Sequence, residues 1–173
     1  MTPAARNAVR ISGSPDETRR LAAALARVAT PGDLLCLWGE LGAGKTQFAK
    51  GFATGLGVPS TVNSPTFVLM AEHDGRLPLF HLDLYRLDGA ADAFAGGLLD
   101  DRQSAGVTLV EWPDRLGPAL PAERVDVRID GTGDGVRRIT VEAPFSRRAY
   151  VEAASDVDLD ERSHARREAE PSR

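Results

Sequence analysis

Apolar residues in the first part of the chain recur at the spacing of an amphipathic helix. Ser14 with Glu17 three residues later is a capping-box sequence, so the sequence predicts a helix that starts there and ends near residue 31. One face of this helix should be buried against the rest of the molecule. We expect that face to consist of Leu21, Ala24, Leu25 and Val28.

Further elements follow from the same kind of pattern. The apolar runs 34–38 and 107–112 predict buried strands, and helical spacing between residues 45 and 57 predicts a helix. One hairpin is expected to pair 67–70 with 77–84, around Asp74-Gly75. A second hairpin is expected to pair 125–130 with 138–142, keeping the alternate residues Asp126, Arg128 and Asp130 on a polar face.

Two segments carry weaker patterns. Residues 88–106 are interpreted as a short helix and a loop around Gly96-Gly97. Residues 151–173 are dense in charged and small polar side chains with little to bury, so we expect a charged, disordered C-terminal tail.

Composition narrows the class of protein. A chain of 173 residues with 42% hydrophobic and 27% charged residues is expected to form one soluble globular domain. The net charge of -4 argues against tight autonomous binding of nucleic acid, which needs a basic face. The single cysteine, Cys36, is interpreted as a buried apolar residue, and the lack of a disulfide partner favours a cytoplasmic location. No segment has the pattern of a signal peptide or a membrane span.

Residues 39–46 read GELGAGKT, a full match to the phosphate-binding pattern G-x-x-x-x-G-K-[ST]. The chain has only two lysines, Lys45 and Lys50, and one of them occupies the lysine position of this motif. An apolar run precedes the motif and helical spacing follows it, as a phosphate-binding loop requires. The predicted fold class is therefore α/β, with a P-loop NTPase-like central sheet, flanking helices and antiparallel hairpins over residues 1–150.

The loop predicts a nucleotide and a metal ion as ligands. Its backbone N–H groups and the start of the following helix should face the phosphates. Lys45 should lie between the β- and γ-phosphates, and the Thr46 hydroxyl should bind Mg²⁺. The predicted nucleotide-binding residues are Gly39, Glu40, Leu41, Gly42, Ala43, Gly44, Lys45 and Thr46.

Such a loop needs a further carboxylate near the metal ion, and two residues are candidates. Asp83 and Glu111 each end a predicted strand, so both can reach the carboxyl edge of the sheet. Position alone leaves each of them equally open to a structural role as the cap of a turn. Ser64 and Thr66 follow the loop helix and are candidates for a hydroxyl that senses the γ-phosphate.

Aromatic residues and histidines add little by themselves. His73, His81 and His164 show no metal-ligand spacing and are interpreted as structural or solvated, with His81 flanking the site at most. Tyr85 and Trp112 are residues that usually pack, but each stands close to a candidate carboxylate, which also allows a role in the site.

Four segments together resemble the TsaE family, also called YjeE. They are Gly39 to Thr46 (GELGAGKT), Ser64 to Phe67 (SPTF), His81 to Arg86 (HLDLYR) and Glu111-Trp112 (EW). Their order and separations match those of the family, and the resemblance covers roughly residues 14–141. The phosphate-binding loop is shared by many families, whereas the HxDxYR and EW segments are much more specific.

The resemblance implies a bacterial cytoplasmic ATPase that is needed to make threonylcarbamoyladenosine next to the anticodon of tRNA. It implies ATP and Mg²⁺ as cofactors and homologues of TsaB and TsaD as partners, with tRNA reached only through them and no membrane involved. ATP turnover would support repeated cycles of that complex, and the chain alone should be a weak ATPase.

The resemblance also implies residue roles. Lys45 and Thr46 bind phosphate and magnesium, Glu111 is the carboxylate beside the metal, and Asp83 acts in hydrolysis. Ser64-Pro65-Thr66 resembles the switch segment of the family. Three further residues belong to the matching motifs with less defined roles: Tyr85, Arg86 and Trp112.

Other functions remain open from the sequence alone. A small-molecule kinase shares the loop and the size of this chain, but the segment around Arg102 lacks a recognisable lid pattern. A GTPase is less favoured, because there is no N-K-x-D motif and Asp83 is not followed by the glycine of D-x-x-G. A nucleotide-gated binding module without required hydrolysis is the third alternative.

Overall fold

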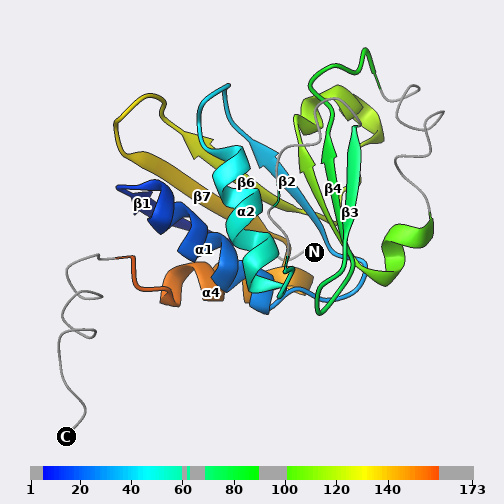
Figure 1. Ribbon diagram of the computed structural model, residues 1–173, viewed down its shortest axis with the longest axis horizontal. Coiled ribbons are helices and arrows are strands. Elements are labelled where there is room, and N and C mark those ends of the chain that lie inside the picture. The colour runs from blue at the N-terminus through cyan, green and yellow to red at the C-terminus, as the bar shows by residue number, and fades with distance from the viewer. Residues whose placement is uncertain (1–5, 60–61, 63–68, 90–100, 160–173) are drawn as a thin grey trace, which may run out of the picture.

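The computed structural model describes residues 6–59, 62, 69–89 and 101–159 (Figure 1). These residues form a seven-stranded sheet in the order β1-β7-β6-β2-β5-β4-β3. The strands are β1 (Arg6–Ser12), β2 (Leu34–Trp38), β3 (Met70–His73), β4 (Leu79–Asp83), β5 (Val107–Glu111), β6 (Val125–Asp130) and β7 (Arg137–Ala143).

The centre of the sheet is parallel and its edges are antiparallel. Strands β6, β2, β5 and β4 run parallel to one another. Strand β3 pairs antiparallel with β4, and β7 pairs antiparallel with both β6 and β1. The structure confirms a mixed α/β fold and the second predicted hairpin. The first hairpin forms with Leu79–Asp83 as predicted, but its other strand is Met70–His73, so it begins three residues later than the predicted run 67–70. The carboxyl ends of the four parallel strands therefore meet at one edge of the sheet.

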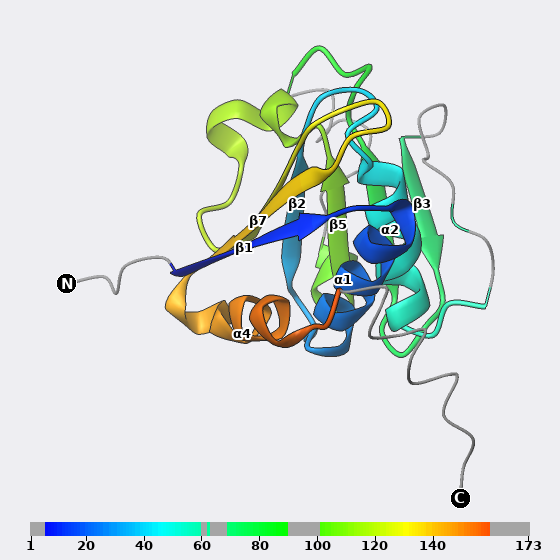
Figure 2. The same ribbon diagram turned by 90° about the vertical axis from the view of Figure 1, so that its left-hand side faces the viewer.

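Helices cover one face of this sheet. They are α1 (Pro15–Arg27), α2 (Lys45–Gly55) and α4 (Arg148–Asp156), and their buried side chains share one hydrophobic core with the inner face of the sheet. A smaller apolar cluster on the other face joins Phe80 and Leu82 to Leu116, which lies in the 3-10 segment Pro113–Ala119. Figure 2 shows this segment and the pair α1 and α2 on opposite sides of the sheet.

Helix α1 begins as predicted but buries a different stripe. The Ser14 side chain accepts a hydrogen bond from the Glu17 backbone N–H, which confirms the cap. Leu21 and Leu25 are fully buried, whereas Ala24 and Val28 are only half-buried. Ala22 and Ala26 are buried in their place, because α1 packs along α2 as well as against the sheet.

The sequence analysis missed strand β1. Its inward residues include Ala8 and Ser12, which are small or polar, while the alternating apolar residues Val9 and Ile11 are exposed, so the sequence pattern does not mark a buried face. The strand exists because β7 offers a partner, with Ala8 opposite Val141. It also contacts α4, where the Arg10 guanidinium donates to the Ala154 carbonyl at 2.6 Å.

The expectation of a disordered tail from residue 151 is wrong for its first nine residues. Residues 151–159 continue helix α4 and the segment after it, and Val151, Ala154 and Leu159 are buried. The Arg20 guanidinium donates to the Leu159 carbonyl at 3.2 Å. Few apolar residues suffice here because each one fits against α1, β1 or β7. Residues 160–173 lie outside the described part of the chain.

The predicted polar face of the second hairpin is only partly correct. Arg128 and Asp130 are exposed, but Asp126 is buried beside the Trp38 and Arg124 side chains. Its Oδ1 accepts hydrogen bonds from Trp38 Nε1 at 2.7 Å and from Arg124 Nε at 2.9 Å. In the segment 88–106, a 3-10 helix spans Asp101–Ala105, while residues 90–100 are outside the described ranges. Among described residues, no helix combines the length and apolar character needed to cross a membrane.

Candidate functional site

The Gly39–Thr46 loop connects the carboxyl end of β2 to the first residues of α2. Gly42 and Gly44 have φ angles of +83° and +109°, a region that side-chain-bearing residues rarely adopt. A Cβ atom at either position would meet nothing within 4 Å, so backbone conformation and not space requires glycine here. Gly44 is also the N-cap of α2, so the loop leads directly into the positive end of that helix.

Lys45 is buried although it carries a positive charge. Its Nζ donates to the carbonyl oxygens of Gly39 at 2.6 Å and Glu40 at 2.8 Å. The same ammonium lies 4.3 Å from the centroid of the Trp112 ring, a cation–π contact. Burial lowers the pKa of Lys45, and the nearby carboxylates, Glu111 foremost, act in the opposite direction.

The two candidate carboxylates lie side by side. Asp83 and Glu111 are directly opposite in the parallel pairing of β4 with β5, and Glu111 is also opposite Leu37 of β2. Both carboxylates are almost fully buried, at 4% and 3% exposure. Asp83 Oδ1 accepts a hydrogen bond from the Tyr85 backbone N–H at 3.0 Å. The predicted convergence of these two residues at the edge beside the loop is therefore confirmed.

His81 is more closely involved than its sequence position indicated. It is fully buried on β4, and its Nε2 lies 3.0 Å from Oε1 of Glu111. This hydrogen bond fixes the orientation of the Glu111 carboxylate. The sequence signal was the alternation along the strand, because His81 and Asp83 are two residues apart and so share a face.

A cavity of about 430 Å³ brings these groups together. Tyr85 and Trp112 stand on its wall with ring centroids 4.8 Å apart. Trp112 has a φ angle of +59°, unusual for a large side chain, which marks strained backbone at the site. The cavity is lined by Leu41, Gly42, Gly44, Lys45, Thr46, Gln47, Asp83, Tyr85, Arg86, Glu111 and Trp112.

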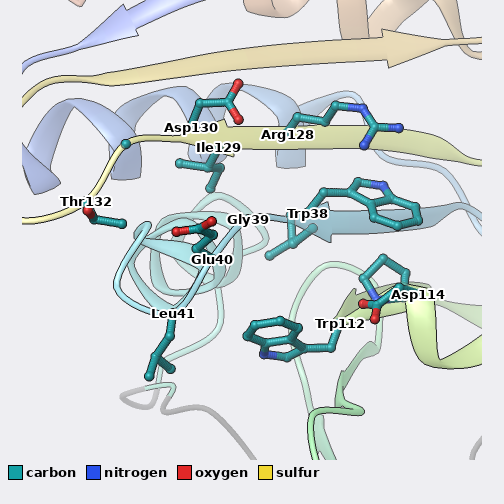
Figure 3. Close-up of a pocket in the computed structure, with 13 residues that line it drawn as sticks. Trp38, Gly39, Glu40, Leu41, Trp112, Asp114, Arg128, Ile129, Asp130 and Thr132 are labelled. Carbon is teal, nitrogen blue, oxygen red and sulfur yellow. The ribbon is translucent and has the colours of Figure 1, made fainter.

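A second and larger hollow, of about 770 Å³, adjoins the other end of the loop. Glu40 and Leu41 of the loop line it, and Figure 3 shows Trp112 on one side of it and β6, which carries Arg128 and Asp130, on the other. The Arg128 guanidinium lies 4.9 Å from the Trp38 ring centroid. This hollow combines aromatic surface with charged groups of both signs, which suits an amphipathic ligand.

The predicted switch residues, Ser64, Pro65 and Thr66, lie outside the described residues. Within the described ranges, no group of three or more His, Cys, Asp and Glu side chains forms a metal cage. The donors near Lys45 are two carboxylates and the Thr46 hydroxyl, hard oxygen ligands of the kind that Mg²⁺ uses together with phosphate oxygens.

Comparison with known proteins assigns the family. The family model "Threonylcarbamoyl adenosine biosynthesis protein TsaE" matches residues 12–139. This chain belongs to the TsaE family. The match contains the loop, Asp83 and Glu111, and it stops before α4.

Relatives within the TsaE family are similar over most of their length. The protein named tRNA threonylcarbamoyladenosine biosynthesis protein TsaE from Bacillus subtilis (strain 168) is 46% identical over 135 residues, 78% of this chain and 84% of the relative. The protein of the same name from Treponema pallidum is 40% identical over 131 residues, 76% of this chain and 97% of the relative. The crystal structure of Bacillus subtilis YdiB superposes with a TM-score of 0.71 at 39% identity, covering 89% of this chain and 97% of that one.

Proposed function

We propose that this chain is a P-loop NTPase-like, Mg²⁺-dependent ATPase that works in the biosynthesis of threonylcarbamoyladenosine in tRNA. The observation that carries the proposal is the placement of Lys45, Asp83 and Glu111 around one cavity at the end of a glycine-bearing loop. The pathway is proposed from the names of the TsaE relatives.

The loop supplies the binding site for polyphosphate. Backbone N–H groups of the loop and the N-terminus of α2 attract anions. Lys45 adds a positive charge in a site shielded from water, where contacts between charged groups are strong. Phosphate oxygens would compete with the Gly39 and Glu40 carbonyls for its ammonium protons.

The two carboxylates would have different roles, Glu111 in binding the metal ion and Asp83 in hydrolysis. The Thr46 hydroxyl and Glu111 would hold Mg²⁺, which neutralises charge on the phosphates when bound. His81 keeps the Glu111 carboxylate in one orientation. Asp83 would orient the attacking water or accept its proton, and the Tyr85 N–H holds one of its oxygens. Arg86, Tyr85 and Trp112 would close the wall of the cavity around the γ-phosphate.

The larger hollow would receive the rest of the nucleotide. It shares Leu41 and Trp112 with the Lys45 cavity, so it adjoins the proposed phosphate site. Trp38 and Trp112 offer aromatic faces for a base, and polar groups on β6 can meet a ribose.

The family and the net charge support a proposal for the partners and the compartment. The net charge of -4 suits a protein that reaches tRNA through TsaB and TsaD homologues in the cytoplasm and does not grip it alone. A switch at Ser64 to Thr66 would couple the bound nucleotide to docking on those partners.

The first test is calorimetric titration of the parent chain with Mg²⁺ and ATP. Lys45→Ala should weaken binding about a hundredfold, because it removes charge-assisted contacts worth a few kcal/mol. Lys50→Ala is the matched control, since Lys50 is the other lysine of the chain and lies further along α2. Equal affinity of the parent and Lys45→Ala would refute the assignment of the loop.

The second test is multiple-turnover modification of unmodified tRNA by the TsaB and TsaD homologues, with and without this chain. Modification should depend on the chain, and Asp83→Asn should not replace it. Full support by Asp83→Asn that still binds ATP would favour the nucleotide-gated binding module. Transfer of phosphate to a small metabolite, and not to water, would favour the kinase.

A further inference from the structure

Arg137, the first residue of β7, reaches across to the phosphate-binding loop. Its Nε donates to the Ala43 carbonyl at 2.9 Å, and its Nη2 contacts the Gly42 carbonyl at 3.3 Å. The same guanidinium donates to the carbonyls of Gly133, at 2.7 Å, and Gly135, in the turn between β6 and β7. One side chain therefore joins two segments that are 94 residues apart.

Arg137 lies on the opposite side of the loop from the catalytic groups. The loop separates the cavity of Lys45, Asp83 and Glu111 from a third, smaller hollow of about 290 Å³. Gly42, Gly44 and Gln47 line both this smaller hollow and the Lys45 cavity, whereas Arg137 lines only the smaller hollow. The contacts of Arg137 with this loop are to backbone carbonyls, so the structure gives the residue a route to the Lys45 side through the loop.

The backbone of Arg137 is held in place by its neighbours in the sheet. Its backbone is opposite Ser12 in the pairing of β7 with β1. Ser12 is fully buried, and its hydroxyl lies 2.7 Å from the Thr18 hydroxyl at the start of α1. Strand β1 pairs with β7 at Arg137 itself and β6 pairs with it from Arg138 onward, so the guanidinium projects from the first residue of a strand that has a partner on each side.

The hydrogen bonds from Arg137 satisfy backbone carbonyl groups of the loop. A loop that turns successive N–H groups toward an anion turns carbonyl oxygens away from it, because each peptide unit is planar. Those carbonyls need donors of their own, and Arg137 supplies them for Gly42 and Ala43. All four described acceptors of Arg137 are neutral carbonyls, so its positive charge also adds to the anion-attracting field of the loop.

We infer that Arg137 is a positioning residue for the nucleotide: it holds the carbonyls of Gly42 and Ala43 from behind and so fixes the loop N–H groups in the orientation that binds polyphosphate. This inference rests on the proposed binding of ATP by the loop. It predicts an effect on every ligand that carries a diphosphate group, whatever its base.

The test compares Arg137→Ala, Arg137→Lys and the control Arg138→Ala. Arg138 is the next residue of β7 and is exposed on the other face. Affinity for ATP, ADP and inorganic pyrophosphate is measured by calorimetry in the presence of Mg²⁺. Arg137→Ala should weaken all three by about tenfold or more, since two charged-donor contacts to the loop are lost. Arg137→Lys should fall in between, because one ammonium cannot span both segments, and Arg138→Ala should stay within about twofold.

Steady-state kinetics separate positioning from chemistry. Arg137→Ala should raise the KM for ATP by about the same factor as Kd and leave kcat within about threefold. The reason is that the loop binds the phosphates equally well in the ground state and in the transition state. Should Arg137→Ala fail to fold, amide hydrogen exchange of residues 42–46 in folded Arg137→Lys replaces it, and faster exchange than in the parent is expected.

Unchanged affinity in Arg137→Ala, an equal loss in Arg138→Ala, or unchanged exchange in Arg137→Lys would overturn the inference alone. A parent chain that binds none of the three ligands would overturn the proposed function and the inference with it. Loss of ATP binding with retained pyrophosphate binding would also overturn the inference, since it would place the effect at the base or ribose.

Discussion

At the scale of single residues, the site concentrates charged groups that are removed from water. Lys45, Asp83 and Glu111 are each at most 5% exposed. Such burial is costly unless each charge has partners. Lys45 has two carbonyls and the Trp112 ring, Glu111 has His81, and Asp83 has the Tyr85 N–H. These contacts hold the groups in place before any ligand arrives.

Glu111→Gln and Asp83→Asn should affect different steps. Glu111→Gln should raise the Mg²⁺ concentration needed for tight ATP binding by about tenfold, because it removes an anionic oxygen ligand. Asp83→Asn should lower turnover by about a hundredfold with nearly unchanged affinity, as expected for a group that acts in the transition state. Magnesium-dependent calorimetry and steady-state hydrolysis measure the two effects.

The matched control for this pair is Glu142→Gln, an exposed carboxylate on β7. It should leave both quantities unchanged. If both site variants hydrolyse ATP at the parent rate, the two-carboxylate mechanism is wrong.

Binding of ATP should take up protons at alkaline pH. Burial lowers the pKa of Lys45 from the ordinary 10.5, so part of the free chain loses this proton below that pH. Phosphate oxygens next to the ammonium favour the charged form, so the bound chain regains the proton. Affinity should therefore decline as pH rises through the lowered pKa. Calorimetry in two buffers of different ionisation enthalpy reports the uptake, and identical enthalpies in both buffers would contradict it.

At the scale of elements, one carboxylate ties the C-terminal helix to the core. Asp33, directly before β2, accepts hydrogen bonds from the Thr30 N–H at 2.9 Å and from the Tyr150 hydroxyl at 2.6 Å. Arg147 Nε lies 2.6 Å from its other oxygen. Burial and this carboxylate together raise the pKa of the Tyr150 hydroxyl, so it remains a donor. Helix α4 is thus fixed by long-range contacts and not by its own composition.

Tyr150 variants should show how much α4 contributes to stability. Tyr150→Phe should reduce the free energy of unfolding by about 1–3 kcal/mol, because buried Asp33 loses a donor. Tyr150→Ala should reduce it by about 3–5 kcal/mol, because a large buried ring is removed as well. Glu152→Ala, an exposed change on the same helix, should stay within about 0.5 kcal/mol. Denaturant unfolding measures all three, and parent-like stability of Tyr150→Ala would mean that α4 does not dock in solution.

At the scale of the whole molecule, the central strand β2 links the core to the site. Its residues Leu35, Cys36 and Leu37 are fully buried between the parallel neighbours β5 and β6, and the same strand leads into the Gly39–Thr46 loop. Burial raises the pKa of the Cys36 thiol to about 12, so the thiolate is absent at neutral pH. Cys36 is also the single cysteine of the chain, which makes it an unambiguous probe of unfolding.

Labelling of Cys36 by a thiol reagent should require the protein to unfold. The rate at neutral pH should follow the population of unfolded chain, and denaturant should increase it steeply. ATP with Mg²⁺ at about a hundred times Kd should slow labelling by about a hundredfold, because the nucleotide binds only the folded state. Rapid labelling of the native protein, unaffected by nucleotide, would contradict this picture of the core.

The sequence by itself determined the local features of this protein. The capping box before α1, the strand–loop–helix order around Gly39 to Thr46 and the two hairpins were readable because each depends on residues close together in the chain. The motifs also identified the TsaE family. Val28 does pack against the core, although it is only partly buried, whereas Ala22 and Ala26 and not Ala24 complete the buried stripe of α1, because that stripe depends on what packs against the helix.

The tertiary structure alone decided the rest. Asp83 and Glu111 became neighbours through the order of β4, β5 and β2 in the sheet, and the support of Glu111 by His81 followed from the same pairing. Strand β1, helix α4 and the contact of Arg137 with Gly42 and Ala43 depend on partners far away in the sequence. Local patterns carry no record of such partners, because a strand edge or a carbonyl becomes a binding surface only when folding brings the other chain segment to it.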